Sequence, residues 1–177
     1  LDYGMIFRFY LPLVATNYIK SFAMPIINIG LARTPSPETA ISTYAVTWGL
    51  AIIIIGPLIF FHQIPIHFSD EQQMPQVKRF TIIMGTFFTA VMALISLTPL
   101  GYGIIHNLIG ASEHISKMAV IVLRIFILFI PTFIIKEYYW GMLMKDRKTK
   151  YIVSGIIVNV LTVTLIILVL SNMNLAN

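Results

Sequence analysis

The segment LPLVATNYIKSFAMPIINIGLAR, residues 11–33, decides the fold class, because it is apolar enough to enter a bilayer yet carries a lysine, two asparagines and two prolines. On an α-helix, each residue turns by about 100°, which gathers the polar positions of this region on one side. These positions are Tyr10, Asn17, Lys20, Ser21, Met24 and Asn28. An ammonium or amide group in hydrocarbon costs a few kcal/mol, so we expect this side to face a bundle interior or a water-filled cavity.

Two prolines divide the same segment. Pro12 and Pro25 each remove a backbone donor and clash with the preceding turn, so the helix is predicted to bend or open there and leave carbonyls free. Asn17 and Asn28 have two interpretations: they hydrogen-bond to neighbouring helices, or they line a cavity. Lys20 favours the cavity.

The composition of the whole chain is that of an integral membrane protein. Its 177 residues are 58% hydrophobic and 11% charged, with a mean hydropathy of +0.86, whereas about a quarter of the residues of soluble domains are charged. Uncharged runs cover residues 39–69, 80–112 and 151–177, and a span needs roughly 20 residues. We predict an all-α membrane protein, a single transmembrane domain over residues 1–177, with spans at 5–32, 40–68, 80–97, 117–144 and 151–170.

The charge distribution predicts the orientation. The net charge of +5 does not indicate nucleic-acid binding, because the basic residues are concentrated in loops. Two loops on one side of the predicted membrane carry Lys78, Arg79, Lys145, Arg147, Lys148 and Lys150, whereas the other side offers mainly Arg33 and Lys117. We therefore expect a multi-pass protein of the cell membrane with a cytoplasmic amino end.

The loops between the predicted spans contain residues that typically begin or end a helix. Ser36 and Pro37 are an N-cap and a first-turn proline, which predicts a helix start directly after the first outer turn. Thr98 caps a second start, and Gly110 ends the short helix that follows, which is predicted to lie on the outer interface.

The second span contains Pro57 as a bending point and two histidines near its end. His62 and His67 are five residues apart, about 140° around a helix, which is a poor spacing for chelation. Metal-dependent chemistry would need both to converge with Asp70 or Glu71, so we predict no metal site and no cofactor, and hydrogen bonding instead.

The third span carries a stripe of small residues, which predicts close helix packing rather than chemistry. The stripe consists of Gly85, Thr89, Ala93 and Ser96.

The fourth span holds the second candidate surface. Arg124, Pro131 and Tyr138 are seven residues apart and share a face, with Lys136 and Glu137 on other faces. Two interpretations remain open: a polar-lined, deformable helix with Pro131 as a bending point, or snorkelling Arg and Lys side chains beside an aromatic belt.

The sequence lacks the motifs of an enzyme. It contains no GxSxG, no HExxH, no phosphate-binding glycine loop and no paired acids within a span, so we do not expect an enzyme. The absence of cysteine excludes disulfides and thiolate metal sites.

Short motifs along the chain resemble those of a transporter superfamily. They are Pro12-Leu13, Thr16-Asn17, Asn28-Ile29-Gly30, Gly56-Pro57, Gln63-Ile64-Pro65-Ile66, Thr98-Pro99-Leu100-Gly101, Arg124, Pro131, Gly141-Met142-Leu143 and Arg147-Lys148-Thr149. The pattern is similar to the multidrug/oligosaccharidyl-lipid/polysaccharide exporters (MOP superfamily, MATE-like), and the nearest relatives are progressive-ankylosis-type transporters and their bacterial counterparts.

The resemblance implies two lobes of six helices around a cavity that opens alternately to each side. The chain would supply most of the amino-terminal lobe, as a fragment that lacks its true start or as one of two associating copies. Many multidrug members couple transport to sodium or protons through an aspartate on the first helix. This chain has Asn17, Lys20 and Asn28 and no acid there, so we do not expect cation coupling at that place, and the coupling ion stays open. A cationic helix instead favours an anionic partner.

We therefore expect a secondary transporter that moves an organic anion or amphipathic solute. Lys20 and Arg124 are predicted to contact the anion, and Asn17, Asn28 and Tyr138 to line its cavity. The expected partners are membrane lipid, the anionic solute and the second lobe or second copy.

Two alternatives remain. The first is a flippase for lipid-linked saccharides, with a wider and more basic cavity. The second is a membrane scaffold or assembly subunit that moves no substrate, in which Lys20 is paired with an acid such as Glu137.

Overall fold

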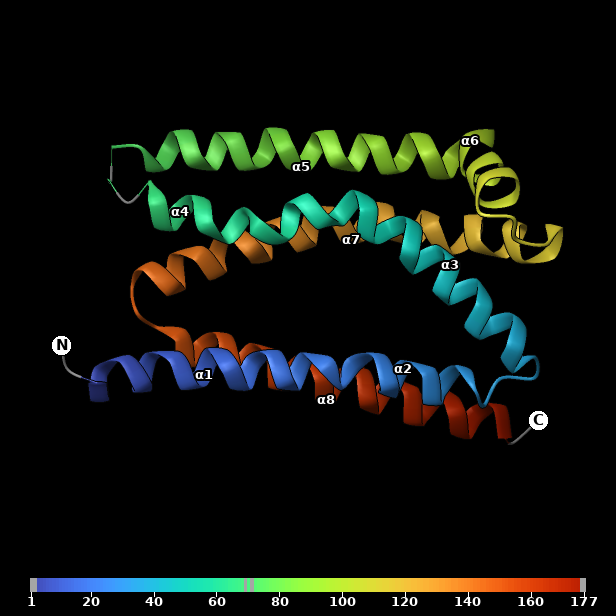
Figure 1. The fold of residues 1–177 in the computed structure, drawn as a ribbon, viewed down its shortest axis with the longest axis horizontal. Helices are drawn as coiled ribbons and strands as arrows, with labels where there is room; N and C mark the ends of the chain where they lie inside the picture. Colours follow the sequence, from blue (N-terminus) through green and yellow to red (C-terminus); the bar gives the residue numbers. More distant parts are fainter. Residues whose placement is uncertain (1–2, 69, 71, 176–177) are drawn as a thin grey trace. The chain divides into compact units, whose positions relative to one another are not determined.

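The structure, a computed structural model, describes residues 3–68, 70 and 72–175. The described part of the chain is helical, with turns between helices and no strand. It divides into two compact units. Figure 1 draws the chain with colours that follow the sequence from the N-terminus to the C-terminus. The terminal unit is Leu1–Ile41 with Asp146–Asn177, and the central unit is Ser42–Lys145.

The terminal unit is built on α8 (Thr149–Leu175), which packs against both α1 (Tyr3–Ser21) and α2 (Ala23–Leu31). Figure 1 shows α1 and α2 following one another alongside α8. A glycine permits this approach, since a Cβ atom at Gly30 would lie 2.7 Å from Cγ2 of Ile167.

The first predicted span is interrupted close to Pro25, one of the two prolines at which a bend was predicted. Helix α1 ends at Ser21 and α2 begins at Ala23, with Phe22 between them donating its amide to the carbonyl of Ile19 at 3.2 Å. Pro25 has no N–H to give to the carbonyl of Ser21, which explains the break. At Pro12 the backbone stays helical, and its side chain lies outside the described residues.

The central unit packs its helices around α7 (Glu113–Lys145). Helix α3 (Pro37–Ile55) enters it from the terminal unit and continues as a 3-10 helix, η1 (Gly56–His62), and then as α4 (Gln63–His67). Helix α5 (Met74–Leu97) runs beside α7, and α6 (Pro99–Gly103) with the π-helix η2 (Ile104–Leu108) joins the two (Figure 1). The core includes Ile55, Leu58, Met92, Leu123 and Ile130.

The predicted helix starts and stops are confirmed. Helix α3 begins at Pro37, and the carbonyl of Ser36 accepts from the amide of Ala40 at 3.0 Å. Thr98 Oγ1 accepts from the amide of Leu100 at 3.3 Å, which caps α6. Gly110 has φ +79°, the left-handed region that glycine adopts without strain. The structure adds that the short helix ends as a π-helix rather than as α.

The small-residue stripe of the third span packs as predicted. Gly85 and Ser96 are buried, Thr89 and Ala93 are half-buried, and a Cβ at Gly85 would lie 2.9 Å from Cγ2 of Ile134 on α7. Small residues therefore set the distance between α5 and α7.

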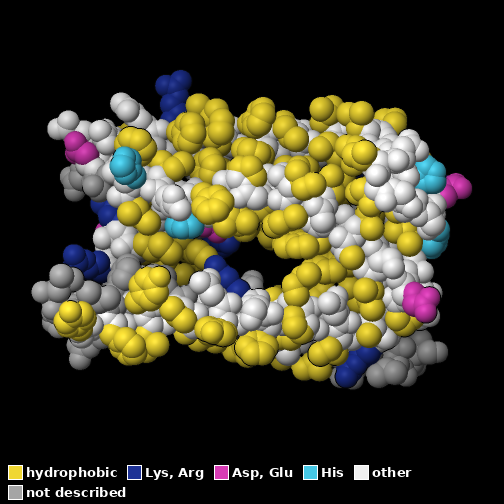
Figure 2. Space-filling view, viewed as in Figure 1, with side chains coloured by type: hydrophobic (Ala, Val, Ile, Leu, Met, Phe, Trp, Pro, Cys, Tyr) yellow, Lys and Arg dark blue, Asp and Glu magenta, His cyan; other side chains and the backbone are white. Residues whose placement is uncertain are grey.

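Within the described residues, four helices are long and apolar enough to cross a membrane: Pro37–His67, Met74–Leu97, Glu113–Lys145 and Thr149–Leu170. They correspond to the last four predicted spans. They also expose apolar side chains, such as Leu128 at 76% and Ile125 at 65%. Figure 2 shows hydrophobic side chains over the middle of α5. The fold is that of an all-α membrane protein.

Candidate functional site

A carboxylate lies on the buried stripe of α7. The stripe recurs every three or four residues, with one longer step, and consists of Ser116, Ala119, Leu123, Ile130, Ile134, Glu137 and Gly141. Glu137 is only 4% exposed, within a helix that is apolar enough to cross a membrane. A charged group at such a position requires partners.

Two cationic or titratable side chains meet this carboxylate. Lys136 Nζ lies 2.8 Å from Glu137 Oε1, and His62 Nδ1 donates to Glu137 Oε2 at 3.0 Å. The same Nδ1 lies 2.8 Å from the carbonyl oxygen of Ile59. Because a carboxylate and a carbonyl only accept hydrogen bonds, Nδ1 carries the proton and Nε2 holds the lone pair of the neutral ring.

Lys136 is held by aromatic rings as well as by the carboxylate. Its Nζ lies 3.8 Å from the ring centre of Phe133 and 4.5 Å from that of Trp140. A cation over an aromatic face is stabilised by the quadrupole of the ring. The aromatic residues of this region therefore orient the lysine beside Glu137. The interpretation of Lys136 as a snorkelling side chain did not predict this ion pair.

Local backbone features bring η1 onto α7. Pro57 lies in the first turn of η1, where the chain leaves the α-helical winding of α3. On α7, Gly141 provides the space: a Cβ there would collide with the carbonyl oxygen of His62 and lie 3.0 Å from Cγ of Pro65. The close approach of these backbones places the ring of His62 against Glu137.

The cluster of His62, Lys136 and Glu137 is here called the HKE cluster. Lys136 and Glu137 carry opposite charges, so the cluster has a net charge of zero with neutral His62 and of +1 with protonated His62. Its exposure is uneven, since the side chain of Glu137 is 5% exposed, that of His62 25% and that of Lys136 37%. The carboxylate is thus buried, whereas the two nitrogen-bearing side chains are partly exposed.

The predicted site residues are divided between the two units. Lys20, Asn17 and Asn28 lie on α1 and α2, and Arg124 and Tyr138 lie on α7. Every position predicted to share the polar side of the first span is exposed, namely Tyr10, Asn17, Lys20, Ser21, Met24 and Asn28. Their exposure fits a side of these helices that is not packed on α8.

On α7 the predicted face differs from the buried one. Arg124 is exposed, and its Nε lies 3.4 Å from the carbonyl oxygen of Ser96. Tyr138 is half-buried, with its ring 5.4 Å from that of Tyr139. Helix α7 continues through Pro131 without interruption.

The hydrogen bond between His62 and Glu137 was not predicted from the sequence. A usable signal was present, because Glu137 is the one acid well inside a predicted span and continues the 3–4 spacing of Ile130, Ile134 and Gly141. Apart from residues such as 69 and 71, which are not described, the chain holds no group of three or more His, Cys, Asp or Glu side chains suited to a metal ion.

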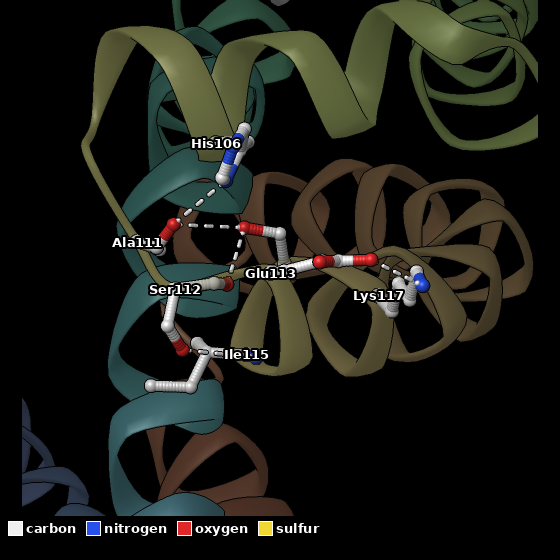
Figure 3. Close-up of polar contacts among 7 residues, drawn as sticks. His106, Ala111, Ser112, Glu113, Ile115 and Lys117 are labelled. Carbon is white, nitrogen blue, oxygen red and sulfur yellow. Dashed lines mark hydrogen bonds and ion pairs between the residues drawn. The ribbon is translucent and has the colours of Figure 1, made fainter.

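A second polar cluster, at the start of α7, is structural (Figure 3). His106 Nδ1 donates to the carbonyl of Ala111 at 3.0 Å, and Ser116 Oγ donates to the carbonyl of Ser112 at 2.8 Å. Ser112 Oγ accepts from the amide of Ile115 at 3.4 Å, as an N-cap does. These bonds close the loop after η2.

The long apolar helices, with apolar side chains outward and an ionised cluster inside, define a multi-pass helical membrane protein. The family model described as progressive ankylosis protein (ANKH) matches residues 1–177, the whole chain. The chain belongs to this family of transporter-like membrane proteins, as the resemblance of its motifs predicted. No curated protein and no solved structure gives a significant match.

Proposed function

We propose that the protein is a secondary transporter of the MATE-like type, which moves an organic anion or amphipathic solute by alternating access. The observation that carries this proposal is the HKE cluster. Charged groups inside membrane helices are costly and mark ion or substrate pathways. A scaffold could pack these helices with apolar side chains alone, whereas a transporter requires polar groups inside its membrane helices.

The winding of the second membrane helix supports the same proposal. The 3-10 segment η1 interrupts the helix directly before α4 and carries His62. Transporters bind ions and substrates where membrane helices are discontinuous, because the altered backbone presents polar groups there. The carbonyl of Ile59, which contacts His62 Nδ1, is such a group.

The polar side of α1 and α2 supplies the proposed contacts with the anion. Lys20 is exposed at the end of α1, and Asn17 and Asn28 are exposed on the same predicted side. Within the terminal unit we assign Lys20 to the negative charge of the solute, and Asn17 and Asn28 to its polar groups. The contacts expected from the sequence for Arg124 and Tyr138, which lie in the central unit, stay predictions. The chain would form most of the amino-terminal lobe, with the amino end in the cytoplasm.

The test is uptake by the full-length protein in liposomes. The probes are labelled succinate, tricarballylate and glycerol 3-phosphate, which carry two or three negative charges and cross lipid slowly. Uptake of at least one probe above that of empty liposomes is expected, and Lys20→Met should reduce it at least about tenfold, the effect of losing one charge-assisted contact. Lys78→Met, an exposed lysine at the start of α5, is the matched control and should leave uptake unchanged.

Unchanged uptake in Lys20→Met would remove that residue from the site. If no probe is taken up above the level of empty liposomes, the transport of small anions would be overturned. Movement of a lipid-linked saccharide across the bilayer would then favour the flippase, and its absence would favour the scaffold.

A further inference from the structure

We propose that His62 binds the coupling proton of this transporter at Nε2, and that this proton and the anionic solute cross the membrane together. The inference rests on the proposed transport function and adds the coupling ion, together with the atom that binds it.

The hydrogen bonds of the ring decide which nitrogen takes up the proton. Nδ1 is occupied as a donor, at 2.8 Å from the oxygen of Ile59 and 3.0 Å from Glu137 Oε2. Both contacts persist in the neutral and the protonated ring, because both forms carry a proton on Nδ1. Proton uptake therefore converts Nε2 from acceptor to donor, and it does so without moving the ring.

The charge of the HKE cluster then changes by one unit. The neutral imidazole takes a proton from one aqueous side at its Nε2 lone pair, becomes imidazolium, and later releases the same proton to the other side. With Lys136 and Glu137 both ionised, the net charge rises from zero to +1 while the proton is bound. An uncompensated charge inside a membrane protein is costly, so an anionic solute binds best to the protonated state and travels with it.

The surroundings of His62 contain few competing groups. From α7 it faces Glu137 and Lys136. From α4 the nearest titratable side chain is His67, which is exposed and has its ring 5.1 Å from that of Phe68. From α5 the neighbour of η1 is apolar, with the ring of Phe80 stacked 6.0 Å from that of Phe61. Within the described central unit, a proton on His62 thus acts on Glu137 and Lys136.

The variants follow from the atoms involved. His62→Asn places an amide N–H near the position of Nδ1, so it can keep the hydrogen bond to Glu137 but cannot take up a proton. His67→Asn makes the same change five residues further on, at an exposed position outside the HKE cluster, and is the matched control.

The experiment uses the full-length protein in liposomes with the three anions named above and a pH-sensitive dye inside. In the wild type, inward anion flow should acidify the lumen. With the outside more acidic by about one pH unit and the membrane potential clamped at zero, one proton per transported anion should allow about tenfold accumulation. Exchange of anions at equal pH is measured in parallel. In His62→Asn, the ratio of the anion concentration inside to that outside should fall to about one while exchange at equal pH continues. In His67→Asn, this ratio should match that of the wild type.

Each result is decisive. Wild-type exchange without lumen acidification or pH-driven accumulation would overturn the proton proposal and leave the transport proposal standing. Accumulation in His62→Asn equal to that of the wild type would overturn the assignment to His62. If His62→Asn does not fold, lumen acidification by the wild type still tests coupling. No exchange of any probe would overturn both proposals.

Discussion

The contact between Gly141 and η1 gives the most direct prediction about stability. An alanine at this position puts its Cβ against the carbonyl of His62, 3.1 Å from the carbonyl carbon and 3.0 Å from Cγ of Pro65. Carbon atoms prefer separations of about 3.5–4.0 Å. The atoms contacted belong to the backbone and to a proline ring, so they cannot rotate away. We expect η1 and α7 to separate by about 0.5 Å or more.

This separation should cost about 1–3 kcal/mol, the usual range for overpacking. It should also stretch the 3.0 Å bond from His62 Nδ1 to Glu137 Oε2 beyond good hydrogen-bond distance. Gly49→Ala on α3 is the control, because a Cβ there meets nothing within 4 Å. Alanine at an exposed helix position is favoured over glycine by up to about 1 kcal/mol, so Gly49→Ala should be neutral or stabilising.

The assay is unfolding of the full-length protein in mixed micelles, followed by far-UV circular dichroism as the fraction of SDS increases. The free energy of unfolding of Gly141→Ala should lie about 1–4 kcal/mol below that of Gly49→Ala. Equal stability of the two variants would refute the close approach of η1 to α7 and, with it, the geometry of the HKE cluster.

Three further changes test other contacts by the same unfolding assay. Thr98→Ala removes the cap of α6 and should cost about 1 kcal/mol, with faster hydrogen exchange at the amide of Leu100; unchanged exchange would contradict the cap. Gly110→Ala should cost about 1–2 kcal/mol through its positive φ alone, since a Cβ there meets nothing within 4 Å, and Gly110→Asn should cost less. Glu137→Gln should cost about 1–3 kcal/mol, and a double-mutant cycle of Glu137→Ala and His62→Ala, each of which removes the hydrogen bond between the two side chains, should give a coupling of about 1 kcal/mol; strict additivity would contradict the pair.

Features determined within one helical turn could be predicted from the sequence. Pro37, Thr98 and Gly110 mark helix ends because a cap, a first-turn proline or a left-handed residue acts on backbone groups a few positions away. The break near Pro25 has the same local origin. The long apolar runs were equally visible, because the bilayer selects for length and composition.

The HKE cluster was not predictable in this way. His62 and Glu137 are 75 positions apart, and their contact depends on how η1 is placed along α7. That placement follows from the absence of a side chain at Gly141 and from the 3-10 winding after Pro57. The sequence predicts a bend at this proline, but the type of helix that results depends on packing in three dimensions.

The 3-10 winding of η1 also determines the length of this segment along the helix axis. A 3-10 helix rises about 2.0 Å per residue and an α-helix about 1.5 Å, so the seven residues Gly56–His62 are about 3.5 Å longer than the same residues in α form. Conversion of this segment to α would draw α4 toward α3 by that amount and rotate it by about 140°. A change of winding in the second membrane helix would therefore couple a movement along the helix axis to a rotation of the residues that follow it.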